Sequence, residues 1–134
     1  MHFGVKRGPS FEDFQTKPFK RFVRKENIDE SSLCEAIRRP ELGLIDADLG
    51  GGVIKQRIAR RGEGTSGGYR TIILYRMKDL AFFAYGYPKN ERENITVDEL
   101  DGFKELAKVF LNYDARQLKT AVRSEILTEI ECDD

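Results

Sequence analysis

The sequence predicts an α+β fold in which a small antiparallel sheet of about four strands packs against helices. Two observations predict the sheet. Residues 69–77 and 80–88 are rich in β-branched and aromatic side chains, and three consecutive glycines at 50–52 separate two short extended segments. The helices are predicted by apolar residues that recur every three to four positions on either side of this region. With 134 residues, the chain has the length of one domain with a single ordinary core.

The N-terminal part is expected to contain two helices after a leader. Residues 1–17 lack hydrophobic periodicity and predict a flexible segment. The proline that follows suits the first turn of a helix over residues 19–26. A second helix is predicted to begin within residues 29–32, whose last serine has capping-box spacing with Glu35, and to end at Pro40. These two helices are expected to pack on the sheet.

The middle of the chain changes to the pattern of strands. Residues 42–59 predict a hairpin that turns at the three glycines. The segments 69–77 and 80–88 follow and are apolar at nearly every position, so neither shows the alternation of a half-exposed strand. We therefore expect both to be central strands that are covered on each face.

The C-terminal part returns to helical periodicity. Thr96 and Glu99 have capping-box spacing and open a helix whose apolar stripe continues to residue 111. Residues 114–123 predict another helix, and residues 125–131 alternate like an edge strand. The expected organisation is a leader, a compact domain over residues 18–112, and a C-terminal extension with an acidic tail over residues 113–134.

Composition narrows the class of protein. The formal net charge is zero, with 23 basic and 23 acidic residues, and no apolar run has the length of a membrane helix. The N-terminus lacks the continuous apolar stretch of a secretory signal. Cys34 and Cys132 are far apart and form no metal-binding motif, so their pattern fits a reducing cytoplasm. His2 is the single histidine, which argues against catalysis by histidine. No metal or cofactor is expected.

Positive charge is concentrated in residues 55–70, which hold five cations and one acid. Alternate residues of a strand share a face, so Lys55 and Arg57 should project from the same side of the sheet. Arg60 and Arg61 extend the charge into a loop whose glycines would let a ligand approach the backbone closely. The alternative is an ordinary solvated strand, since exposed cations are common at sheet edges.

More cations enter or follow the central strands. Arg70 begins an apolar strand and needs a partner there, either a ligand or a buried acid. Lys89 and Arg92 follow the last central strand, and a meander would bring them to the same concave surface. Phosphate is the ligand that such a group of cations favours. Tyr69 could stack on a nucleic-acid base, although tyrosines at strand spacing are more often part of a core.

The segment GLIDADLGGGVIKQRIARRGEGTSGGYRTIILYR, followed by FFAYGYPKNERENI, resembles the RelE-type toxins of bacterial toxin–antitoxin modules. The resemblance is closest to the RelE/HigB-like branch of the RelE/ParE superfamily. That branch has a K-x-R strand, a G-x-x-x-S-G-G-Y-R turn into the next strand, and a later K-N-E-R-x-N-I segment. The resemblance spans about residues 18–111 and implies a RelE-like fold for the domain.

The resemblance implies a cytoplasmic toxin that cleaves mRNA on the ribosome, inhibits translation without a metal or cofactor, and is neutralised by a cognate antitoxin. In this chemistry the ribose 2′-hydroxyl attacks the adjacent phosphate, which requires a base, an acid and cations. Some relatives place a tyrosine just beyond the K-x-E-R part of this motif, where this chain has Asn94, Ile95 and Thr96, which leaves the base open. The implied catalytic residues are Lys55, Arg57, Arg70 and Arg92, and the implied RNA-binding residues are Arg60, Arg61, Tyr69 and Lys89.

Two other functions stay open at this point. ParE toxins share the fold but poison DNA gyrase, and a toxin-like domain could also be retained only to bind an antitoxin or nucleic acid. An acidic antitoxin segment would bind the same cations as phosphate does. Site chemistry has to decide among them, because the fold alone does not fix the function.

Overall fold

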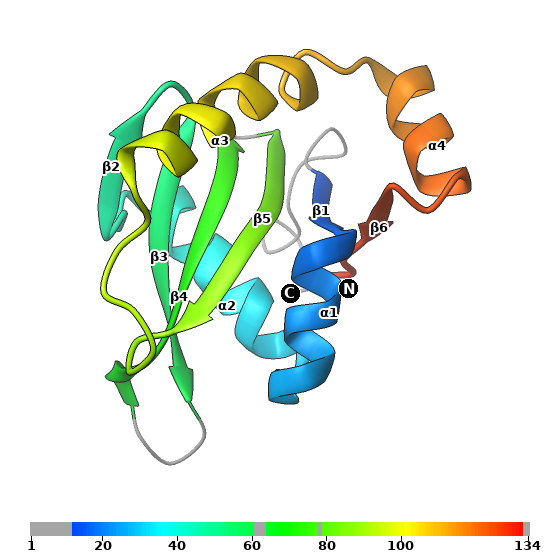
Figure 1. Ribbon diagram of the computed structural model, residues 1–134. Coiled ribbons are helices and arrows are strands. Elements are labelled where there is room, and N and C mark those ends of the chain that lie inside the picture. The colour runs from blue at the N-terminus through cyan, green and yellow to red at the C-terminus, as the bar shows by residue number, and fades with distance from the viewer. Residues whose placement is uncertain (1–11, 61–63, 78, 133–134) are drawn as a thin grey trace.

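The computed structural model describes residues 12–60, 64–77 and 79–132, which form one mixed sheet and four helices (Figure 1). The elements follow in the order β1 (Glu12–Thr16), α1 (Lys17–Glu26), α2 (Glu30–Glu41), β2 (Ala47–Gly50), β3 (Val53–Arg60), β4 (Gly64–Arg76), β5 (Leu80–Pro88), α3 (Val97–Phe110), α4 (Ala115–Arg123) and β6 (Leu127–Glu129). Helices precede and follow a run of four strands, which confirms the predicted α+β class.

The sheet has six strands in the order β2-β3-β4-β5-β1-β6. Strands β2 to β5 form the predicted antiparallel meander, and β4 and β5 both lie in the interior of the whole sheet because β1 pairs with β5. The predicted number of about four strands is too small because β1 and β6 extend the sheet. Strand β1 pairs parallel with β5 and antiparallel with β6, so the sheet is mixed.

Strand β1 lies within residues 1–17, for which the sequence predicts a flexible leader. Its sequence EDFQT shows no alternation because the strand is covered on both sides, and Phe14 and Gln15 are both buried. The strand is held by its two neighbours in the sheet rather than by a pattern of its own. The prediction is wrong for β1, and residues 1–11 lie outside the described part of the chain.

Each face of the sheet carries a separate core. On one face, Ile72 and Phe82 pack with helices α3 and α4, and we call this the α3 face. On the other, Ile73 and Phe83 pack with α1 and α2, and we call this the α1 face. Figure 1 shows α3 crossing one end of the meander while α1 runs beside β1 and β5. Both central strands are therefore covered on each side, as their apolar sequences predict.

Helix starts follow the predicted capping chemistry in one case and depart from it in another. The capping box of Thr96 and Glu99 opens α3 as predicted. Helix α2 does not use Ser32 and Glu35 in this way, because Asp29 takes the N-cap position and accepts a hydrogen bond from the Ser32 N–H at 3.2 Å. The carboxylate is a strong cap, so the helix begins earlier than a cap at Ser32 would allow.

Helix α2 also continues past Pro40, at which the sequence predicts its end. Proline lacks an N–H, so the carbonyl of Ala36 loses its intrahelical donor. The side chain of Gln56, which is fully buried, replaces that donor with a 3.2 Å hydrogen bond from Nε2 to the Ala36 carbonyl. The proline therefore lies in the last turn of the helix at little cost.

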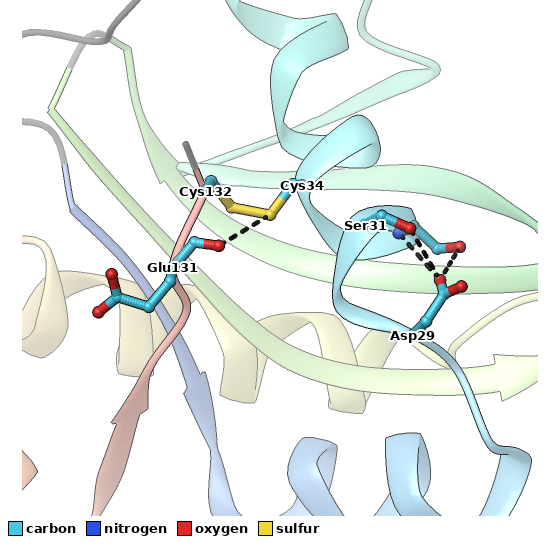
Figure 2. The surroundings of a disulfide bond; sticks show 6 residues. Asp29, Ser31, Cys34, Glu131 and Cys132 are labelled. Carbon is cyan, nitrogen blue, oxygen red and sulfur yellow. Dashed lines mark hydrogen bonds between the residues drawn. A yellow bond between two sulfur atoms is a disulfide. The ribbon is translucent and has the colours of Figure 1, made fainter. Parts of the chain in front are cut away.

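The structure joins Cys34 and Cys132 in a disulfide, although they are 98 residues apart (Figure 2). The Cα atoms are 5.5 Å apart, within the range that a disulfide spans. The bridge ties the segment after β6 to α2, one turn from the Asp29 cap. The two cysteines are distant in sequence, but the sheet topology brings them together. The expectation that their pattern fits a reducing cytoplasm therefore needs correction, because sequence spacing does not reveal this disulfide.

Candidate active site

The register of the meander gathers cations on the α3 face. Arg57 of β3 lies directly opposite Arg70 of β4, which in turn lies opposite Tyr87 of β5. Lys55 lies two positions before Arg57 on β3 and belongs to the same face. Its pairing across β4 leads to Tyr85 of β5. Directly opposite residues share a face with Cβ atoms about 5 Å apart. The strand pairing therefore brings Lys55, Arg57 and Arg70 together from separate parts of the sequence.

Arg57 lies near the edge of the sheet, where Asp46 binds it. Its guanidinium is 3.2 Å from Asp46 Oδ1, and its backbone N–H donates to Oδ2 at 2.7 Å. Burial opposes ionisation of Asp46, but the hydrogen bonds from Arg57 and the charge of Arg39 outweigh it and lower the pKa of the carboxyl. The side chain of Arg57 remains 44% exposed, so an external anion can reach it.

Arg70 is partly buried and lies opposite Tyr87 of β5. Its guanidinium donates to the carbonyl of Tyr69 at 3.3 Å, and its charge acts on the ring hydroxyl of Tyr87. Arg70 lies directly opposite Arg57 on the neighbouring strand, so one anion could contact both guanidinium groups. A phosphate has oxygens enough to bind both.

Lys55 is connected to the loop after β5. Its ammonium group donates to Asn94 Oδ1 at 2.8 Å, and the backbone carbonyl of Asn94 accepts a hydrogen bond from Arg92 Nε at 3.1 Å. The side chain and the backbone of Asn94 thus link Lys55 to Arg92 and hold this loop against β3.

Contacts within the protein use most of the N–H groups of Arg92, so few of them are left to bind a phosphate. Two of its nitrogens contact the two oxygens of Glu99 at 2.5 and 3.1 Å, and one also donates to the Tyr85 hydroxyl at 3.1 Å. With the bond to Asn94, four of its five N–H groups are used. The pKa of Glu99 falls to about 2, chiefly because of these hydrogen bonds, while the pKa of Arg92 rises. The geometry therefore gives Arg92 an anchoring role between the loop and α3.

The two tyrosines opposite the cations pack against each other, with Tyr85 partly exposed and Tyr87 buried. The ring centroids of Tyr85 and Tyr87 are 5.7 Å apart, and the guanidinium of Arg92 lies 5.9 and 5.5 Å from them. The Tyr87 hydroxyl donates to the carbonyl of Glu93 at 3.3 Å. Burial raises the pKa of Tyr87 even though Arg92 and Arg70 act in the opposite direction. Burial thus disfavours the ionised form of the Tyr87 hydroxyl.

Two of the residues expected to bind RNA, Tyr69 and Arg60, lie on the α1 face. Tyr69 is only 4% exposed, packs edge-on against Phe22, and donates to Glu26 at 3.1 Å. Arg60 lies over the Tyr69 ring at 5.5 Å. Neighbouring residues of a strand point to opposite faces, so Tyr69 turns away from the side that carries Arg70. The structure does not bring these two residues to the cluster.

A comparison with known families identifies the fold that carries this cluster. A family model described as the RelE toxin of the RelE/RelB toxin–antitoxin system matches residues 12–130. The chain belongs to the RelE toxin family. The match covers every strand and helix from β1 to β6, so it extends beyond the predicted resemblance at both ends. No curated protein matches the chain.

Membership in the RelE toxin family identifies the chain as the toxin of a toxin–antitoxin system, and such a toxin has an antitoxin partner. None of the helices in the described ranges combines the length and the hydropathy that crossing a membrane requires. In the same ranges, histidine, cysteine, aspartate and glutamate side chains form no group of three that could hold a metal ion.

The remaining predicted residues of this RelE-family chain are Lys89 and Arg61. Lys89 is exposed at the turn after β5, where its backbone N–H donates to the Gly68 carbonyl at 3.0 Å. It lies at the end of the strand that carries Tyr87, on the rim of the cluster. Arg61 lies outside the described residues.

The sequence gives no direct sign of two residues that organise the cluster. Asp46 lies before a short edge strand and binds Arg57 only because β2 pairs with β3. The capping-box spacing predicts that Glu99 caps a helix. Its second role as the partner of Arg92 depends on how the loop folds back, which the spacing does not predict. Both roles depend on contacts across the fold, for which local pattern gives no signal.

Proposed function

We propose that this RelE-family toxin is a metal-independent, ribosome-dependent mRNA endonuclease that inhibits translation in the cytoplasm. The observation that supports the proposal most is the direct opposition of Arg57 and Arg70, with Lys55 on the same face of the sheet. Two adjacent guanidinium groups are suited to a phosphodiester, since each binds phosphate oxygens with paired hydrogen bonds.

The proposed reaction is an intramolecular transfer within the RNA. The ribose 2′-oxygen forms a bond to the adjacent phosphorus while the bond from phosphorus to the 5′-oxygen breaks. The products are a 2′,3′-cyclic phosphate end and a 5′-hydroxyl end. The 2′-hydroxyl proton goes to a base, and the 5′-oxygen receives a proton as it leaves. Arg57 and Arg70 stabilise the charge that develops on the phosphate oxygens in the transition state.

Lys55 is the proposed proton-transfer group. Its position on the same face as the two arginines allows its nitrogen to approach the scissile phosphate, and Asn94 fixes the direction of the ammonium group. Tyr87 is less suited to this role, since its ring is buried and its hydroxyl donates to the carbonyl of Glu93. Of the two tyrosines near the cations, Tyr85 is partly exposed and can offer ring surface to a nucleotide base, whereas Tyr87 is only 3% exposed and packs against it.

Arg92 and Lys89 take supporting parts in the proposal. Arg92 holds the loop after β5 and α3 in place, so that Asn94 can position Lys55. Lys89 is exposed at the rim and can bind a neighbouring phosphate of the mRNA. Asp46 competes with the substrate for Arg57, and an acidic antitoxin segment would compete in the same manner.

The test is induction of the toxin in a bacterial host, with growth and mRNA cleavage measured by primer extension. Arg70→Ala should abolish both growth arrest and cleavage, a loss of at least about 100-fold, because one of two transition-state donors is gone. Arg76→Ala is the matched control, since Arg76 is another arginine of β4 but pairs with Asp79 away from the cluster. It should remain toxic. Full toxicity of Arg70→Ala would contradict the proposed site.

The same experiment separates the other functions. Cuts in phase with codons support the endonuclease. Growth arrest with DNA damage and intact mRNA would indicate a gyrase poison of the ParE kind. Normal growth combined with antitoxin binding would indicate a non-catalytic binding module.

A further inference from the structure

Helix α1 separates its charged and apolar residues almost completely. At 3.6 residues per turn, its five cations fall within an arc of about 140° of the helix circumference. All five side chains are exposed, and they are Lys17, Lys20, Arg21, Arg24 and Lys25. We call these residues the α1 basic stripe.

The opposite side of α1 is used entirely for packing. Phe19 is fully buried and stacks on Phe83 with ring centroids 4.8 Å apart, while Phe22 and Val23 pack in the same core. Glu26, the one acid of the helix, also belongs to this side, where it accepts a hydrogen bond from Tyr69. No acid of α1 therefore lies within the basic stripe.

Among the residues that the structure describes, no acid outside the helix neutralises the stripe. Within the described part of the chain, none of its five residues forms an ion pair. The one side-chain hydrogen bond is from Lys20 to the hydroxyl of Thr128 at 3.4 Å. The five positive charges of the stripe thus lie on the exposed side of one ten-residue helix, in a protein whose net charge is zero.

We propose that the α1 basic stripe binds the phosphate backbone of a second RNA segment, distinct from the one that is cut. The stripe belongs to the α1 face, whereas Arg57 and Arg70 belong to the α3 face, so one short strand cannot contact both directly. The cations recur at every turn, about 5.4 Å, along the helix. A continuous row of cations is the feature that binds nucleic-acid phosphates without reading sequence.

The composition of the stripe argues against two other ligands. Protein interfaces have an apolar core, but the apolar residues of α1 are turned into the protein and leave only charge outside. A membrane-surface helix inserts its apolar side into the lipid, and that side is likewise occupied here. RNA is the polyanion that needs charge alone. The proposal rests on the proposed function only in taking RNA as the class of ligand.

The experiment compares two triple variants of the full chain that change the net charge equally. The first is Arg21→Gln, Arg24→Gln and Lys25→Gln on α1. The control is Arg116→Gln, Lys119→Gln and Arg123→Gln, which removes three exposed cations from α4. Glutamine keeps the helix propensity close to that of lysine and arginine. Circular dichroism and urea unfolding confirm that both variants are folded.

The probe is a fluorescent 20-nucleotide RNA with 2′-O-methyl groups throughout, measured by anisotropy at several salt concentrations. This RNA has no free 2′-hydroxyl and cannot be cleaved by the proposed reaction. Each lost phosphate contact lowers the slope of log K against log salt by about 0.7, so the α1 variant should lose about 2 units and bind on the order of 100-fold more weakly at 0.1 M salt. The α4 variant should keep the slope of the unmodified chain.

Equal losses in the two variants would overturn the proposal, because they would show an effect of net charge only. An unchanged slope in the α1 variant would overturn it as well. So would loss of binding to a labelled polyglutamate peptide with RNA binding intact, which would indicate an acidic protein. If no variant cleaves mRNA but the α1 variant alone loses RNA binding, the nuclease proposal fails while this inference stands.

Discussion

Gly86 lies where α1 meets β5, and two aromatic rings fill the space that a side chain would need. A Cβ atom at this position would be 2.5 Å from Phe22 Cε2 and 3.0 Å from Phe19 Cε1. Both rings belong to the core of the α1 face, so neither can turn away freely. The absence of a side chain at Gly86 therefore allows α1 to pack this closely against the sheet.

Gly86→Ala should lower the free energy of unfolding by about 1–3 kcal/mol, because the added carbon overpacks this contact. Urea unfolding followed by circular dichroism measures the change. The matched control is Gly102→Ala in α3, where a Cβ would meet nothing within 4 Å. That change should stabilise the protein by about 0.5–1 kcal/mol, since alanine favours a helix over glycine. A stable Gly86→Ala variant would show that α1 can shift outward.

Single residues also mark the limit of sequence-based prediction of the site. Lys55, Arg57 and Arg70 could be assigned to one face from alternation and a meander, and the register places them there. The sequence does not show that Tyr69 and Arg70 differ in function, since both directly follow the same glycines in the chain. Only the phase of the strand decides that one faces the cluster and the other the core.

Among the elements, the loop after β5 and the start of α3 form one unit. Glu99 caps α3 through Thr96 and binds Arg92 through both oxygens, so the same carboxylate fixes the helix and the loop. A carboxyl group whose folded pKa is below its ordinary value stabilises the fold above that ordinary value. The contribution is lost as the pH falls toward the folded pKa.

The pKa of Glu99 falls from 4.5 to about 2, so its contribution should disappear between these pH values. Glu99→Gln should be less stable than the unmodified protein at pH 7, and the difference should shrink as the pH approaches 2. Urea midpoints at pH 7, 4 and 2.5 measure this. Arg92→Gln removes the partner and should give the same pH dependence. A difference that stays constant with pH would contradict the role of this ion pair.

Prediction of elements succeeded where a pattern is local. The hairpin glycines, the apolar strands β4 and β5, and the capping box of α3 each carry their own signal within a few residues. Strand β1 and the end of α2 do not. The strand is specified by pairing with β5 and β6, and the helix passes Pro40 because a side chain from β3 replaces the lost donor.

For the whole molecule, the disulfide between Cys34 and Cys132 closes a loop of 98 residues around most of the fold. Cross-linking a loop of about 100 residues stabilises a protein by up to about 4.7 kcal/mol, since it restricts the unfolded chain. Reduction with dithiothreitol should therefore lower the melting temperature markedly. Differential scanning fluorimetry with and without the reductant measures this shift.

Cys34→Ser serves as the control for this prediction. The variant should melt at the temperature of the reduced protein and should not respond to dithiothreitol. An equal melting temperature of the unmodified protein in both conditions would show that the bridge does not form in solution or does not contribute to stability.

Strand β1 is synthesised early but lies between two strands that are synthesised late. Its neighbour β5 ends at Pro88, and its other neighbour β6 is formed by Leu127–Glu129. Pairing of such distant segments is slow, because the intervening chain must first be brought into place. A nascent polypeptide therefore cannot complete this architecture until translation has passed residue 129. An antitoxin of this family therefore meets the completed sheet only after that point in synthesis.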